Sequence, residues 1–158
     1  MTARGTIMRE RIVMEARRWI GTPYIHQAAL PGVGCDCLGL VRGVWGALYG
    51  ALPETPPPYS PDWAEAAGAE SLRDAALRHL VPVATDAVRP GDVLLFRWRA
   101  HVPAKHVAIV AGEGAALSMI HAHDGGSVCE VALSAWWKRH LAYAFSFPGV
   151  AENCVADD

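Results

Sequence analysis

Apolar side chains in the first third of the chain recur at helical spacing in two stretches. In residues 6–20 this pattern predicts one amphipathic helix, which a glycine and a proline then end. Its apolar positions are Met8, Ile12, Val13, Ala16, Trp19 and Ile20. A second apolar face over residues 38–48 predicts another helix. Residues 21–36 are rich in glycine and proline and predict a loop, so Cys37 is expected to begin the second helix.

The middle of the chain carries two further patterns. Residues 53–61 contain five prolines, which exclude a helix or a sheet ladder and favour an extended surface connection. Residues 62–80 are rich in alanine, glutamate, leucine and arginine, with Gly68 as a break, and predict one or two short helices. Neither pattern requires a boundary between domains.

The second half changes to short apolar and β-branched runs separated by turn residues, the pattern of an antiparallel sheet. These runs are PGDVLLF, HVAIV, ALSMIHA, SVCEV and LAYAFSF. The last alternates large and small residues, so one side of it is expected to be buried. LSAWWKRH predicts a short helix whose Trp136 and Trp137 pack in the core; exposure would instead suggest an interface.

The order of these elements predicts the fold class and the domain organisation. Helices followed by strands indicate an α+β domain, with the N-terminal helices packed on a C-terminal antiparallel sheet. We interpret residues 1–150 as a single domain and residues 151–158 as a C-terminal tail.

Composition narrows the classes of partner. Of 158 residues, 52% are hydrophobic and 19% are charged, which suits a folded domain. A net charge of -2, without a run of lysine or arginine, indicates neither nucleic acid nor an anionic membrane surface as a partner. Residues 1–21 lack the continuous apolar stretch of a signal peptide, and no apolar run is long enough to span a bilayer. We therefore expect synthesis in the cytoplasm and no insertion into a membrane.

Cys37 is the candidate nucleophile. At a helix N-terminus, unpaired backbone N–H groups and the macrodipole favour a thiolate over a thiol. Four cysteines without an export signal do not predict a disulfide framework, and Cys35, Cys129 and Cys154 have no chemistry that the sequence assigns. A reactive thiol at Cys37 then needs a histidine as its base.

Two histidines on neighbouring predicted strands can complete such a site. His106 opens a strand next to a loop, where its side chain can face a cleft. His121 lies on the following strand across a short turn, so strand pairing can bring it beside His106 and let it orient the imidazole. His123 lies on the same strand face as His121, and the choice between them stays open.

Together these residues resemble a known family. WIGTPY (residues 19–24), DCLGLV (residues 36–41), PGDVLLF, HVAIV and IHA follow the motif order of the papain-like, NlpC-type cell-wall cysteine peptidases. The stretch HQAALPGVGCDCLGLV looks most like the short peptidases of phage tails and gene transfer agents. Two features depart from the common pattern. Leu38 replaces the serine that usually follows the cysteine, and HQAALPGVGC replaces the glycine-rich segment that usually precedes it.

The resemblance implies a function and a set of site residues. It implies hydrolysis of peptidoglycan stem peptides, commonly at the γ-D-glutamyl-diaminopimelate amide, with no metal or other cofactor. By the same resemblance Cys37 is the nucleophile, His106 the general base and His121 the residue that orients it. Tyr24 and Asp36 are expected to bind substrate. Tail-hub or tail-tip proteins are expected as partners, in a phage-like particle that acts on the cell wall.

Three alternative functions and one question about the site remain open. Cys35, Cys37, His121 and His123 could hold a metal ion in a structural tail protein. A protein with the same fold could instead act as a peptidoglycan amidase or an acyltransferase. A retained site could also be covered by a partner in an inactive tail plug. Finally, the sequence does not identify the second hydrogen-bond donor to the oxyanion of the reaction. Candidates by position only are Tyr24, His26 and Gln27.

Overall fold

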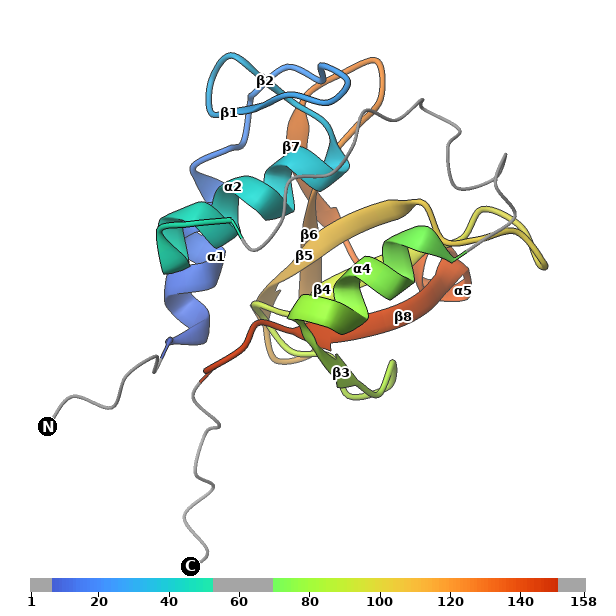
Figure 1. The fold of residues 1–158 in the computed structure, drawn as a ribbon. Helices are drawn as coiled ribbons and strands as arrows, with labels where there is room; N and C mark the ends of the chain where they lie inside the picture. The colour runs from blue at the N-terminus through green and yellow to red at the C-terminus, as the bar shows by residue number, and fades with distance from the viewer. Residues whose placement is uncertain (1–6, 53–69, 151–158) are drawn as a thin grey trace, which may run out of the picture.

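A six-stranded antiparallel sheet forms the centre of the computed structural model, which describes residues 7–52 and 70–150 (Figure 1). Its strand order is β3-β8-β4-β5-β6-β7. The strands are β3 (Val81–Val83), β4 (Val93–Phe96), β5 (His106–Glu113), β6 (Ala116–Ala122), β7 (Val128–Ala132) and β8 (Leu141–Ser146). Hairpins join β5 to β6 and β6 to β7, so the histidines of the predicted site lie on adjacent central strands.

The helices surround this sheet, and a small hairpin precedes the second of them. The helices are α1 (Arg9–Arg17), α2 (Cys37–Tyr49), α4 (Ser71–His79) and α5 (Ala135–His140), and the hairpin strands are β1 (Ala29–Leu30) and β2 (Gly34–Cys35). Figure 1 shows α1 and α2 together at one face of the sheet, where both contact β5. The fold is therefore α+β, with N-terminal helices packed on a C-terminal antiparallel sheet, as the sequence predicts.

Both faces of the sheet are buried. Val93 and Leu95 of β4 pack in one cluster with Ile12 of α1 and Leu40 and Val44 of α2. The alternate β4 residues join a second cluster on the opposite face, whose buried members are Leu94, Phe96, Ala108, Val110, Met119, Leu133 and Ala144. A strand that is covered on both sides has no polar face, which explains why VLLF lacks polar alternation.

Several details differ from the sequence prediction. The apolar pattern places Met8 and Ile20 on the helix face, but both lie outside α1, which spans only Arg9–Arg17, and they are 51% and 45% exposed. The predicted loop 21–36 contains the β1-β2 hairpin, and β3 was not predicted because Pro82 lies at its centre. Trp136 is 47% exposed rather than in the core, since α5 has no fully buried residue.

Some predictions fall outside the residues that the structure describes. These are the extended connection over residues 53–61, the first part of the helical stretch 62–80, and the tail 151–158 with Cys154. Of that helical stretch, α4 is the part that is described, and its presence agrees with the prediction. In residues 7–52 and 70–150, every helix falls short of the length and apolar character needed to cross a membrane.

Candidate active site

Cys37 is the first residue of α2, and Asp36 caps that helix. The Asp36 side chain accepts hydrogen bonds from the backbone N–H of Gly39 and from the backbone N–H of Gln27, each at 2.8 Å. Asp36 is only 2% exposed. A capping carboxylate of this kind stabilises a helix N-terminus by about 1 kcal/mol and here also ties the loop before the helix to it. Asp36 is thus a buried cap that holds the start of the helix in place, and substrate binding by this residue stays a prediction.

Gly39 allows the loop to approach the helix start. A Cβ atom at this position would overlap the carbonyl oxygen of Ala28. The backbone N–H of Asp36 also donates to that carbonyl, at 3.2 Å. The glycine of DCLGLV therefore has a packing role that fixes the position of the neighbouring thiol.

The Cys37 sulfur lies against the start of β5. Its thiol donates to the carbonyl oxygen of Lys105, with the two atoms 3.8 Å apart, and Lys105 directly precedes His106. Burial, and then the Asp36 carboxylate, raise the pKa of the Cys37 thiol to about 12, whereas backbone N–H groups including that of Val107 act in the opposite direction. The resting sulfur is therefore a thiol. The helix start alone does not ionise it, so a histidine has to complete its activation, as the sequence argument expects.

His106 and His121 are in direct contact on neighbouring strands. Nε2 of His106 and Nδ1 of His121 are 3.0 Å apart, and the two residues are 9% and 3% exposed. Val110 pairs with Met119 in the β5-β6 ladder, so side-chain alternation places both histidines on one face of the sheet. His123 is exposed, and its ring centroid lies 6.0 Å from that of His121. Of the two histidines left open by the sequence, His121 is the one that contacts His106.

Aromatic rings enclose His106. Its ring stacks on Trp98 and on Trp137, with centroid distances of 5.2 and 5.9 Å. Desolvation in this enclosure, and then the neighbouring histidines, lower the pKa of His106 to about 3. Burial likewise lowers the pKa of His121 to about 4. Both imidazoles are therefore neutral near pH 7, the state in which His106 can accept a proton.

The sequence did not indicate Trp98 and Trp137 as parts of the site. Trp98 follows β4, and Trp137 lies in α5, far from His106 along the chain. Aromatic residues near a predicted strand end are usually explained by core packing, so no local pattern distinguishes these two. Their role follows only from the way in which β4, α5 and β5 meet.

Two other residues from the sequence analysis have clear positions. Tyr24 is half-buried, packs against the same core cluster as Cys37, and pairs with Cys35 in an isolated β-bridge. Burial, and then the charge of a Cys37 thiolate, raise the pKa of the Tyr24 phenol above its ordinary value, so it remains a neutral O–H group. Cys35 is fully buried in β2, and burial raises the pKa of its thiol to about 11. Tyr24 is thus near the sulfur, and Cys35 is a buried, unreactive thiol.

The metal-site alternative lacks a ligand set in this part of the protein. Among residues 7–52 and 70–150, His, Cys, Asp and Glu side chains do not form any group of three that could hold a metal ion. Cys35 and Cys37, which the alternative requires together, instead occupy a buried strand and the helix start.

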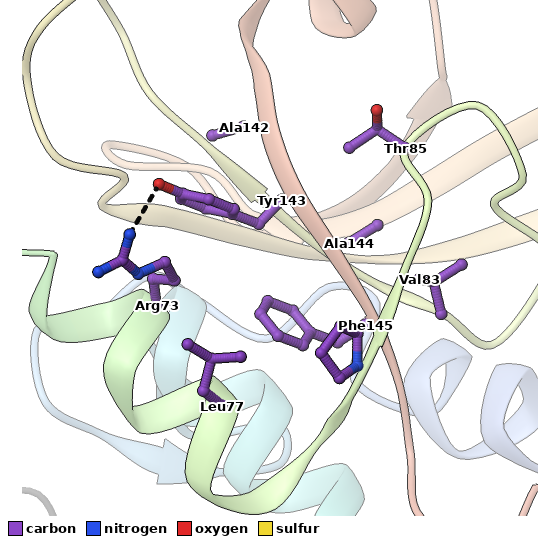
Figure 2. A pocket seen from close by; sticks show the side chains of 9 residues that line it. Arg73, Leu77, Val83, Thr85, Ala142, Tyr143, Ala144 and Phe145 are labelled. Atoms are coloured by element: carbon purple, nitrogen blue, oxygen red, sulfur yellow. Dashed lines mark hydrogen bonds between the residues drawn. The ribbon is translucent and has the colours of Figure 1, made fainter.

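A separate pocket of about 320 Å³ lies where α4, β3 and β8 meet (Figure 2). Arg73, Leu77, Val83, Tyr143 and Phe145 are among its lining residues, and Nη1 of Arg73 lies 3.4 Å from the Tyr143 hydroxyl. The cysteine and histidines described above do not line it. This pocket is therefore distinct from the candidate active site.

A cysteine at a helix start, whose sulfur contacts the residue directly before a buried pair of histidines, is an arrangement suited to covalent hydrolysis by a thiol. The sequence matches the model of the NlpC/P60 family over residues 21–145. The chain belongs to this family, whose members are cysteine hydrolases that act on peptidoglycan.

Individual relatives agree with this assignment. The chain is 32% identical over 103 residues to the gamma-DL-glutamyl hydrolase of Bacillus subtilis, a match that covers 65% of this chain and 21% of that protein. The chain thus spans about a fifth of the length of that relative. The solved NlpC/p60 domain of the peptidoglycan hydrolase SagA is 26% identical, with a TM-score of 0.62, over 89% of this chain and 100% of that one. An NlpC/P60 protein from Bacillus cereus is 22% identical, with a TM-score of 0.63 over 90% of this chain and 41% of that one, and shows the fold alone.

The burial of neutral His106 predicts a loss of stability as the pH falls. An unfolded imidazole takes up a proton below its pKa of 6.5, whereas folded His106 stays neutral down to about pH 3. Its contribution is therefore complete above pH 6.5 and is lost progressively below it, amounting to about 2 kcal/mol at about pH 5. Urea unfolding of the wild type and of His106→Gln, each at about pH 7.5 and 5, measures this difference.

His101 offers a matched control for this experiment. It is exposed and has a positive φ of 68°, which asparagine tolerates better than most residues. His101→Asn is expected to keep the full pH dependence of the wild type. An equally steep loss of stability in His106→Gln and in the wild type would contradict the assigned role of His106 burial.

Proposed function

We propose that this chain is a cysteine endopeptidase that hydrolyses peptidoglycan stem peptides, with Cys37 as nucleophile, His106 as general base and His121 as the residue that orients His106. One observation carries the proposal: the Cys37 sulfur lies 3.8 Å from the carbonyl oxygen of the residue before His106, whose ring contacts His121 at 3.0 Å. Membership of the NlpC/P60 family supports the substrate class.

Acylation begins from the neutral pair. The Cys37 thiol turns from the Lys105 carbonyl, transfers its proton to Nδ1 of His106, and attacks the carbonyl carbon of the scissile amide. The backbone N–H of Cys37 donates to the oxyanion that forms. The C–N bond then breaks, and the leaving amine takes the proton from His106, which leaves a thioester on Cys37.

Deacylation uses the same groups in reverse. His106 removes a proton from a water molecule, whose oxygen attacks the thioester carbon. The C–S bond breaks, and Cys37 recovers its proton from His106. A neutral His106 is required at the start of acylation and again at the start of deacylation, and burial keeps this imidazole neutral near pH 7 by lowering its pKa.

We propose the γ-D-glutamyl-diaminopimelate amide as the scissile bond. The similarity to the gamma-DL-glutamyl hydrolase of Bacillus subtilis supports an acyl group of the γ-glutamyl type. Tyr24, half-buried beside the thiol, remains the candidate for contact with this acyl group, through a phenol that stays neutral. Leu38 lies next to the nucleophile where the family pattern has serine, so it is expected to influence this choice of bond.

Product masses after digestion of purified sacculi test this proposal. Cleavage at the proposed bond leaves L-alanyl-D-glutamate on the glycan and releases peptides that begin with diaminopimelate. An amidase would instead release whole stem peptides, and an acyltransferase would yield peptides joined to an added amine. Products of either latter kind, or digestion that is unchanged in Cys37→Ala, would overturn the proposal.

We further propose that this peptidase is carried in the tail of a phage or gene transfer agent, where it opens the cell wall beside tail-hub or tail-tip proteins. The resemblance of residues 26–41 to tail peptidases supports this placement. Peptides of this chain in purified particles, and their loss from tail-less particles, are the expected result. Absence from intact particles would exclude the tail context without affecting the peptidase chemistry.

A further inference from the structure

His121 has a second contact that the proposed mechanism does not use. Cys129 lies directly opposite His121 in the ladder between β6 and β7. Its sulfur is 3.6 Å from Nε2 of His121, while Nδ1 of His121 is 3.0 Å from Nε2 of His106. Both nitrogens of this buried imidazole are therefore occupied, one by the proposed base and the other by a thiol.

The proton on neutral His121 decides whether His106 can act as a base. When Nε2 of His121 carries the proton, Nδ1 is bare and accepts from the Nε2–H of His106, which leaves Nδ1 of His106 free to take the thiol proton. When Nδ1 of His121 carries the proton, the roles reverse, and His106 has its own proton on Nδ1. Only the first arrangement supports the proposed reaction.

We propose that Cys129 is a positioning residue of this site, which accepts a hydrogen bond from the Nε2–H of His121 and so selects the productive tautomer of the histidine pair. This inference rests on the proposed function for its kinetic consequence, but the tautomer itself is a property of the resting protein. In this way Cys129, on the next strand of the sheet, holds the orientation of His121.

The surroundings of His121 suit this role. The residue is 3% exposed, so water has little access to Nε2 and the Cys129 sulfur is its partner. Trp137 packs edge-on against the ring, with centroids 5.2 Å apart, which restricts its rotation. Sulfur is a weak acceptor, and a weak partner biases a tautomer without attracting a proton to make imidazolium.

Nitrogen-15 NMR of the histidine side chains in the full chain tests the proposal directly. The wild-type spectrum is expected to show the His121 proton on Nε2 and the His106 proton also on Nε2. Cys129→Ala is expected to raise the share of His121 that carries its proton on Nδ1. A wild-type His121 protonated on Nδ1, with Cys129 then donating to Nε2, would overturn the proposal.

Kinetics provide a second measurement. Cys129→Ala is expected to lower kcat roughly 10-fold with little change in KM, because the partner of an orienting group is lost while substrate contacts remain. Cys129→Asn, whose side-chain carbonyl can accept from Nε2–H, is expected to recover most of this loss. Val131→Ala truncates a half-buried side chain two positions along β7 and is expected to retain the wild-type kcat.

The two measurements separate this proposal from the proposed function. If the wild type does not cleave stem peptides while His121 is protonated on Nε2, the peptidase function fails and the positioning contact stands. If it cleaves them while Cys129→Ala keeps both the wild-type kcat and the wild-type tautomer, the role of Cys129 fails and the function stands. Equal losses of kcat in Cys129→Ala, Cys129→Asn and Val131→Ala would show a merely structural effect and also overturn it.

Discussion

Cys37→Ala is expected to lower kcat/KM for stem-peptide hydrolysis by roughly 10⁴-fold or more, since it removes the only atom that forms the acyl-enzyme. The substitution is small: Cys37 is half-buried, and the caps and contacts that hold α2 come from Asp36 and Gly39. The folded state is therefore expected to persist. Release of soluble peptide from sacculi, followed by chromatography, measures the effect.

Cys35→Ala is the matched control for that variant. Cys35 is two residues away and fully buried, so its loss is expected to cost about 1 kcal/mol of stability and leave turnover close to that of the wild type. Substantial hydrolysis by Cys37→Ala would exclude Cys37 as the nucleophile. Equal inactivation by Cys35→Ala would indicate damage to the loop before α2 instead of a chemical role.

The helices and most strands could be predicted because their local patterns and their packing agree. The apolar face of α2 and the runs that become β4 to β8 pack in the two core clusters, fully or partly buried, as the periodicity indicates. β3 could not be predicted, since Pro82 argues against a strand unless it lies at a sheet edge. The position of Trp136 was also not predicted, because composition alone does not show which tryptophan of α5 faces the core: Trp137 packs against the second cluster, whereas Trp136 is exposed.

The candidate site was predictable in its residue types but not in its electrostatics. The order of the motifs singled out Cys37, His106 and His121, whose catalytic roles stay a prediction. The sequence argument for a reactive thiol combined the helix dipole with a nearby histidine and did not include the burial that raises the thiol pKa to about 12. Burial depends on which segments meet at the helix start, and this is information that a local pattern does not contain.

An ion pair at the N-terminal end of α1 links that helix to the sheet. Arg9 donates from Nη1 to Oδ1 of Asp92 at 2.7 Å and to the carbonyl oxygen of Pro90 at 3.0 Å. Asp92 is fully buried, and its other oxygen accepts from the backbone N–H of Arg89 at 2.8 Å. The aspartate of PGDVLLF is thus explained by a link between α1 and the turn that enters β4.

Asp92→Ala is expected to lower the free energy of unfolding by about 3–5 kcal/mol, because it leaves the Arg9 guanidinium buried without its carboxylate. Arg17→Ala is the control on the same helix: Arg17 pairs with Glu130 at 2.9 Å, but its side chain is 48% exposed, so a loss below about 1 kcal/mol is expected. Urea denaturation of the two variants gives both values.

The double variant Arg9→Met with Asp92→Ala is expected to lose less unfolding free energy than the sum of the two single variants, since no unpaired charge remains. Equal, small losses in Asp92→Ala and Arg17→Ala would contradict the buried pair as the link between α1 and the sheet.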